Sequence, residues 1–326
     1  MRGASSSPLL ADDFNSLNLT VISNSSLVLT TDDRQWLTLS FAILTALGLL
    51  INFLVLIYIL VRKLFRNFVS SHFIGHLSFT NLISCVYLLP IFIQNVHSGQ
   101  DLFASVPRLC QFHAFVTCAI WSVIYYMSTC VAGVHLLTFA RIHYDQLFGL
   151  HPSIICFLSW LIGVSLGLPC LTNSSIVKYD SNYHHCLWQA NYNGHKFLAY
   201  LVLLGILLPV ILTAYAYFKV LAIFYHAPIV FQTLGIFKAR YLIFAMILTP
   251  FTQFPFFIAR LLPEQYTMEP LVYPIIMFLA YSPALINGVV YGLALFMMKE
   301  DDMALTARSH KHNTYTAPGV VPAQEV

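Results

Sequence analysis

The chain has 326 residues, of which 58% are hydrophobic and only 9% are charged, and its mean hydropathy is +0.74. A soluble domain carries about 25% charged residues, so the composition excludes an ordinary soluble protein and favours one embedded in a lipid bilayer. The formal net charge of +3 is small and the basic residues are scattered, which argues against a nucleic-acid partner.

Seven segments of at least 19 residues lack Asp, Glu, Lys and Arg. In chain order they are 35–61, 67–100, 109–140, 146–177, 197–218, 241–259 and 270–298. A membrane-spanning helix needs about 20 apolar residues, whereas a barrel strand needs about 10, and only helices and closed barrels satisfy their backbone in lipid. We therefore predict an all-α membrane protein, a seven-transmembrane helix bundle over 36–298, with an N-terminal tail over 1–35 and a C-terminal tail over 299–326.

The short connecting segments predict the orientation. With the N-terminus outside, the inner segments hold more Lys and Arg than the outer ones, as expected for a membrane protein. N-x-[ST] sequons begin at Asn18, Asn24 and Asn173, and all of them fall outside in this topology. The start MRGASSSPLLADDF lacks the apolar core of a cleaved signal peptide. We expect a multi-pass plasma-membrane protein with an extracellular N-terminus, a cytoplasmic C-terminus and glycosylation at these asparagines.

The seven segments also limit the class of activity. No Asp or Glu lies deep within them, which argues against pumps and ion-coupled transporters, because those need ionisable groups inside the membrane. The patterns HExxH, GxSxG and CxxC are absent, and several of the 13 histidines fall in polar loops or the tail. We therefore expect no enzymatic activity, no bound metal and no cofactor.

A series of sequence landmarks occurs in a characteristic order. They are Asn52 in LLINFLVL, HLSFTNLIS at 76–84, Cys110, Trp160 with Pro169, Cys186 in HHCLWQ, Pro209 with Tyr217, and SPALINGVVY at 282–291. Taken together, they resemble the rhodopsin-like (class A) G-protein-coupled receptors. The resemblance implies a small-molecule or peptide ligand, signalling to heterotrimeric G proteins, an arrestin partner, and a disulfide between Cys110 and Cys186.

The chain departs from this family at its signalling positions. The family's acid-Arg-Tyr triplet aligns with Val134, His135 and Leu136, and a neutral imidazole lacks the fork and permanent charge of arginine. A hydrogen bond from His135 to a tyrosine on another helix would be one substitute. The resemblance places the G-protein switch at four residues: His135, Tyr217, Asn287 and Tyr291.

Further departures concern the sodium site and the kinks. Asn81 stands where the family has a sodium-binding aspartate, and Gly288 replaces the proline of the seventh helix as a softer hinge. Either Pro250 or Pro255 could kink the sixth helix, and we choose Pro250 because it leaves an outer loop of sensible length.

The resemblance places the ligand pocket between the outer halves of helices 3, 5, 6 and 7. The positions that this predicts are Thr117, Trp121, Tyr125, Tyr200, Phe251, Gln253, Arg260, Met277 and Tyr281. Thr117 replaces the aspartate of amine receptors, and Tyr281 replaces the retinal lysine of opsins. A mostly aromatic cavity with few polar groups favours a small lipophilic ligand, neutral or weakly anionic, and a chemosensory role is one candidate.

Two other hypotheses stay open. The first is an atypical receptor or scaffold that couples weakly, which the missing triplet favours. The second is a seven-helix passive transporter or channel, which a polar stripe through the helix centres would favour, and the sequence shows no such stripe.

Overall fold

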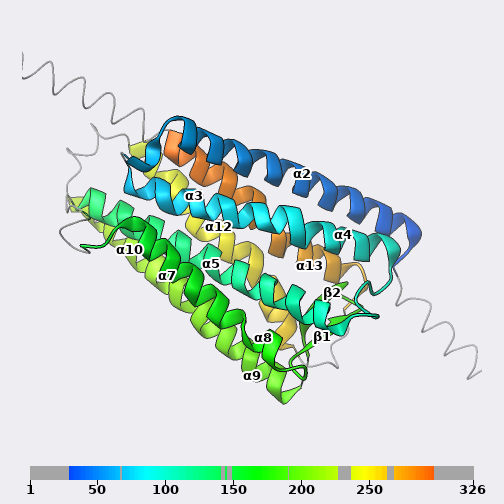
Figure 1. The fold of residues 1–326 in the computed structure, drawn as a ribbon. Helices are drawn as coiled ribbons and strands as arrows, with labels where there is room; N and C mark the ends of the chain where they lie inside the picture. Colours follow the sequence, from blue (N-terminus) through cyan, green and yellow to red (C-terminus); the bar gives the residue numbers. More distant parts are fainter. Residues whose placement is uncertain are drawn as a thin grey trace, which may run out of the picture.

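The computed structural model describes residues 29–66, 68–140, 144, 149–189, 191–226, 236–262 and 268–296. Its helices run side by side as an elongated bundle, with a two-stranded hairpin at one end (Figure 1). We refer to this end of the bundle as the hairpin end. The predicted glycosylation sites Asn18 and Asn24 and the predicted C-terminal tail lie outside the described residues.

The elements follow the predicted segments closely. They are α2 (Thr31–Val61), η1 (Leu64–Arg66), α3 (Val69–Ile83), η2 (Ser84–Leu88), α4 (Leu89–Ser98), α5 (Pro107–Phe139), α7 (Pro152–Gly167), α8 (Pro169–Thr172), β1 (Val177–Asp180), β2 (His185–Trp188), α9 (Tyr192–Tyr200), η3 (Leu201–Leu207), α10 (Leu208–His226), α12 (Ile236–Leu261) and α13 (Val272–Tyr281). After a turn at Ser282, the last helix continues over 283–296.

The number of membrane-length helices agrees with the sequence. Within the described ranges, 6 helical segments are long and apolar enough to cross a membrane. The 26-residue α12 supplies the remaining predicted span. The prediction of a seven-helix bundle is therefore confirmed.

The bundle is arranged around α5. The buried share of the most apolar 18-residue window is 72% in α5 and 22% in α2. The outer helices instead expose large apolar side chains such as Phe53, Phe157 and Phe218. Contiguous exposed apolar surface of this kind is rare on soluble monomers, so it is the surface that lipid covers.

Two helices change their winding just before a proline. The π-helical turn η2 precedes Pro90, and the π-helical turn η3 precedes Pro209. Proline has no N–H and its ring clashes with the preceding turn of an α-helix, and a π-turn accommodates that conflict locally. In α12 both Pro250 and Pro255 lie inside the helix, so the structure does not select one of them as the kink.

Buried amides join the first, second and last helices. Asn52 donates through Nδ2 to the carbonyl oxygens of Gly48 (2.7 Å) and Ala284 (2.6 Å), and its Oδ1 accepts from Asn81 Nδ2 at 3.1 Å. The Nδ2 of Asn81 is therefore engaged with α2, while its Oδ1 has no hydrogen-bond partner among the described residues. Hydrogen bonds between helices are the polar interactions that specify packing in lipid.

Gly288 allows the last helix to approach this amide cluster. A Cβ atom at this position would lie 3.0 Å from both side-chain polar atoms of Asn52 and 3.0 Å from Ile51. The helix is continuous across Gly288, and the glycine permits a close contact between helices; its role as a softer hinge stays a prediction.

Replacing Gly288 with alanine is expected to lower the free energy of unfolding by about 1–3 kcal/mol. Overpacking a tight interior costs about that much, and Asn52 cannot move aside while three hydrogen bonds hold it. Thermal unfolding of the purified protein in detergent measures the change.

Gly133 is the matched control, because it also lies in a long helix but a Cβ there meets no atom within 4 Å. Gly133→Ala is expected to be neutral or stabilising by up to about 1 kcal/mol. Equal stability of the two variants would contradict the assigned role of Gly288.

Candidate functional site

The hairpin closes one end of the bundle. Strands β1 and β2 pair antiparallel, with Val177 opposite Trp188 and Asp180 opposite His185. A disulfide joins Cys186 of β2 to Cys110 at the start of α5, with the two Cα atoms 5.4 Å apart. The predicted disulfide is therefore confirmed, and it fixes β2 over the end of the central helix.

Cys170 was the other cysteine near this end that could have paired with either partner. Its sulfur instead lies 3.9 Å from the sulfur of Cys118, and both thiols are free and buried. Cys170 therefore forms no disulfide with either Cys110 or Cys186.

Side chains of β2 fill the space between the helices. All four residues of β2 are buried. His185 Nδ1 lies 3.0 Å from the carbonyl oxygen of Cys186, and Nε2 lies 2.5 Å from the hydroxyl of Tyr281. A carbonyl oxygen only accepts, so Nδ1 is the donor and Nε2 accepts from the Tyr281 hydroxyl. Burial lowers the pKa of His185 to about 4, so the ring is neutral at pH 7.

An aromatic cluster lies beside this hydrogen bond. Trp121 of α5 contacts Phe256, Phe257 and Tyr281 edge to face, with ring centroids 5.2–5.9 Å apart. Trp188 of β2 stacks on Phe257 with centroids 6.3 Å apart. Such pairs contribute about 0.5–1.5 kcal/mol each beyond the area they bury, so the cluster joins α5, α12, β2 and the last helix.

Most of the predicted pocket residues lie inside the bundle. Thr117, Trp121, Tyr125, Gln253, Met277 and Tyr281 are all buried. Gln253 Nε2 donates to the carbonyl oxygen of Ala280 at 2.9 Å, while its Oε1 has no partner among the described residues. Thr117 packs beside Tyr281 and donates to the carbonyl oxygen of His113 at 2.9 Å.

Two predicted pocket residues need correction. Phe251 is 71% exposed and Tyr200 is 41% exposed, on the outer surface of the bundle, so neither lines an internal cavity. Their neighbours Gln253 and Leu201 face inward instead. One residue along a helix rotates a side chain by about 100°, so a small error in alignment exchanges a lipid-facing position for an interior one.

Arg260, which the sequence places in the ligand pocket, has a structural role at the hairpin end. Its Nη1 forms an ion pair with Asp180 Oδ2 at 2.7 Å, its Nη2 donates to the carbonyl oxygen of Trp188, and its guanidinium lies 5.2 Å from the ring centroid of Tyr183. The residue therefore fastens the hairpin to α12 and offers little free charge to a ligand.

Sequence reasoning missed several residues of this site. Phe256 and Phe257 follow Gln253 by one helical turn, and this spacing on one helix face could have identified them. His185 and Trp188 flank Cys186, and the expected disulfide could have indicated that both lie at the bundle. His113 is buried with its ring centroid 4.6 Å from that of His185, and no sequence signal pointed to it.

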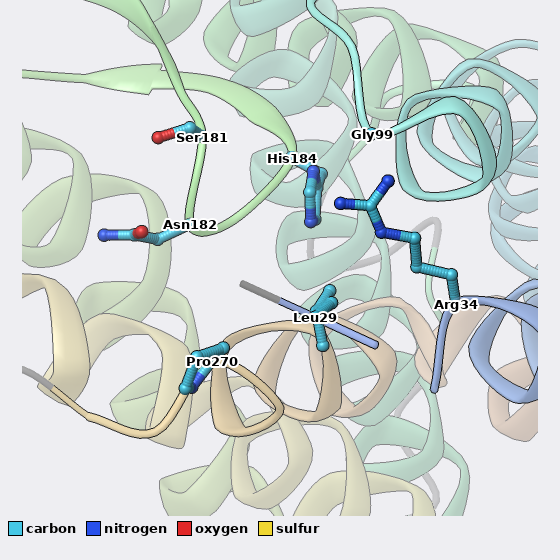
Figure 2. Close-up of a pocket in the computed structure, with 7 residues that line it drawn as sticks. All are labelled: Leu29, Arg34, Gly99, Ser181, Asn182, His184 and Pro270. Carbon is cyan, nitrogen blue, oxygen red and sulfur yellow. The ribbon is translucent and has the colours of Figure 1, made fainter. Parts of the chain in front are cut away.

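A cavity opens at the mouth of the bundle, outside the aromatic cluster. It has a volume of about 210 Å³ and is lined by Leu29, Arg34, Gly99, Ser181, Asn182, His184 and Pro270. Figure 2 shows the guanidinium of Arg34 directed toward the imidazole of His184.

A second hollow, of about 330 Å³, faces outward between α2 and residues 283–296, among side chains such as Leu54 and Phe296. Because both of these side chains are exposed on the outer surface, this groove is a place for lipid chains.

The predicted switch residues lie within the bundle interior. Tyr217 and Tyr291 are buried close to each other, and Asn287 Oδ1 accepts from the hydroxyl of Thr249 at 2.7 Å. His135 is 1% exposed, and neither ring nitrogen has a hydrogen-bond partner in the described part of the chain. Of the possible tyrosine partners that the structure describes, neither Tyr217 nor Tyr291 forms a hydrogen bond with His135.

The described glycosylation sequon is accessible. Asn173 is exposed between α8 and β1, and its Oδ1 accepts from the backbone N–H of Ser175 at 3.0 Å. Glycosylation at Asn173 stays a prediction, as it does at Asn18 and Asn24.

Comparison with known proteins assigns the family. No curated protein matches the chain significantly. The family model described as 7 transmembrane receptor (rhodopsin family) matches residues 51–291, which extends from α2 to near the end of the last helix. The chain therefore belongs to the rhodopsin family of seven-transmembrane receptors.

Proposed function

We propose that the protein is a ligand-activated plasma-membrane receptor that signals to heterotrimeric G proteins and binds arrestin. In this proposal the hairpin end is extracellular and receives the ligand, and the opposite end is cytoplasmic. The disulfide between Cys110 and Cys186 supports this orientation, because disulfides form in oxidising compartments. The exposed sequon at Asn173 lies near the same end.

The observation that carries the proposal is the contact between the hairpin and the last helix. His185 accepts a hydrogen bond from Tyr281, and Tyr281 packs on Trp121 of the central helix. A molecule that displaces β2 side chains therefore changes contacts on α5, α12 and the last helix together. Such a change is what a ligand must produce to shift a receptor between two states.

The chemistry of the cluster limits the ligand. Aromatic rings form most of its surface, and the polar groups nearby are few, among them the Gln253 Oε1 and the Tyr125 hydroxyl, neither with a described partner. Pockets of this composition recognise lipophilic molecules and orient them by a few hydrogen bonds. We therefore propose a small lipophilic ligand that is neutral or weakly anionic.

A weakly coupling, atypical receptor is the second candidate. His135 is buried without a hydrogen-bond partner among the described residues, where the family uses an arginine. A neutral ring in that position can stabilise a state only by packing, without the directional ionic contacts that arginine forms.

A ligand screen tests the proposal directly. Neutral and weakly acidic lipophilic compounds are applied to cells that express the receptor, with G-protein activation and arrestin recruitment both measured. We expect a hit whose potency falls by about tenfold or more in Trp121→Ala at equal surface expression, since truncating a buried tryptophan at a binding site commonly costs more than 2 kcal/mol. Arrestin recruitment without G-protein activation would favour the atypical receptor instead.

Tyr281→Phe is expected to raise basal G-protein activation about fivefold. The change keeps the ring but leaves His185 Nε2 without its donor, and a net hydrogen bond is worth about 1 kcal/mol, which corresponds to a fivefold shift in an equilibrium. Basal activation is measured at matched surface expression.

Tyr215→Phe is the control, because Tyr215 lies on the outer surface of α10 and is 58% exposed. If Tyr281→Phe and Tyr215→Phe behave alike, the hydrogen bond to His185 does not restrain the receptor.

His135→Arg is expected to raise the maximal G-protein response, because arginine supplies the charged fork that a neutral imidazole lacks. Adding Val134→Asp is expected to lower the basal level, since the neighbouring carboxylate would pair with that arginine in the inactive state. His97→Arg, on an exposed position of α4 at the hairpin end, should leave both quantities unchanged. An unaltered response in both His135 variants would show that this segment only packs the bundle.

A further inference from the structure

The cavity at the mouth has a charge character that the aromatic cluster lacks. Among its described lining residues, Arg34 carries the only formal charge and no side chain is acidic. Two carboxylates of the hairpin end are engaged elsewhere, since Asp180 pairs with Arg260 at 2.7 Å and Asp101 Oδ1 accepts from the backbone N–H of Phe103 at 2.8 Å, while Glu269, beside Pro270 in the sequence, is exposed to solvent. The cavity is therefore complementary to an anion.

Arg34 is held in place at the cavity wall. Its side chain is half-buried, and its Nε is buried without a partner among the described residues. The guanidinium lies against Gly99, where a Cβ atom would come within 1.9 Å of Nη1. Gly99 ends α4 with a φ of 64°, a conformation that glycine adopts most readily. The guanidinium therefore occupies the space that a side chain at position 99 would fill.

His184 supplies a second, unpartnered polar group. The residue is 7% exposed, and its Nδ1 has no hydrogen-bond partner in the described structure. Its backbone adopts a φ of 50°, and its carbonyl oxygen accepts from Asn95 Nδ2 at 3.2 Å, which holds the ring at the cavity. A buried polar atom without a hydrogen-bond partner destabilises the protein, so a ligand that forms this hydrogen bond removes an unfavourable contribution.

The charge state of His184 follows from its surroundings. Burial lowers its pKa, the nearby Arg34 lowers it further, and Asp180 opposes these effects. A neutral imidazole donates one hydrogen bond and accepts another. The cavity thus holds one positive charge, which favours a monoanion over a dianion.

The remaining walls define the rest of the ligand. Ser181 and Asn182 lie across the cavity from the guanidinium of Arg34, and Leu29 and Pro270 form an apolar wall between the two sides (Figure 2). The cavity volume is about 210 Å³, which is small for a ligand pocket. The space fits a small molecule with one anionic group and a short apolar body.

We propose that this cavity binds a small organic acid through its carboxylate, with Arg34 as the main contact and His184 as a second donor. Guanidinium and carboxylate match as planar, bidentate partners. The inference rests on the proposed function only for the claim that binding here affects signalling, and binding itself is measurable without it.

Direct binding to the purified full-length receptor in nanodiscs provides the test. The probes are butyrate, hexanoate and benzoate, compared with their uncharged amides and with inorganic phosphate, all at matched ionic strength. We expect saturable binding of at least one acid, seen by calorimetry and as a raised unfolding temperature. The affinity for the corresponding amide should be lower by about tenfold or more, because the charged hydrogen bonds are lost.

The variants separate the charge from its geometry. Arg34→Gln should abolish acid binding, Arg34→Lys should weaken it because the fork is lost, and His184→Ala should weaken it to a smaller extent. Gly99→Ala should also weaken binding, since its methyl group displaces the guanidinium. Lys178→Gln is the matched control, because Lys178 is an exposed cation on the same hairpin, and it should bind the acid as the unmodified receptor does.

Each outcome decides the proposal. Failure of all three acids to bind, equal binding of the amides, equal binding of phosphate, or full acid binding by Arg34→Gln would each overturn it. If an acid binds through Arg34 but never activates a G protein, the inference stands and the proposed function fails. If neutral ligands activate the receptor while no acid binds, the proposed function stands and the inference fails.

Discussion

Burial of β2 between the helix ends is the constraint on which the rest of the hairpin end depends. All four of its residues are buried, so their backbone groups need partners inside the protein. Strand β1 supplies some of them, and Arg260 binds the carbonyl oxygen of Trp188. A two-stranded hairpin is marginal by itself. The disulfide, the Arg260–Asp180 ion pair and the bond from Tyr281 to His185 hold it to three different helices.

Within the membrane, polar contacts and small residues specify the packing of the helices. Lipid chains are as apolar as leucine, so burying leucine between helices gains little. On α7, a Cβ atom at Gly163 would lie 2.9 Å from the carbonyl oxygen of Ala119, and one at Gly167 would lie 2.9 Å from that of Phe115. These glycines let α7 lie directly against α5. The amide contacts of Asn52 perform the corresponding task between α2 and its neighbours.

The sequence predicts the spans well because length and absence of charge decide them, and neither depends on tertiary structure. It predicts the facing of individual residues poorly. Helices in lipid are apolar on both sides, so no hydrophobic period separates Phe251, which faces outward, from Phe256, which faces inward. The hydrogen-bond partners of His184 and His185 could not be predicted either, because they come from α4 and from the last helix, which are distant in the sequence.

The adjacent residues His184 and His185 connect the mouth cavity to the interior of the bundle. His184 lies at the mouth cavity, and His185 bonds to Tyr281 inside the bundle. Coupling between two sites requires that a ligand interact differently with the two states. Loss of one hydrogen bond of about 1 kcal/mol shifts an equilibrium only about fivefold. A larger response therefore requires that the hairpin move as a unit, so that Trp188 also leaves its stacked contact with Phe257.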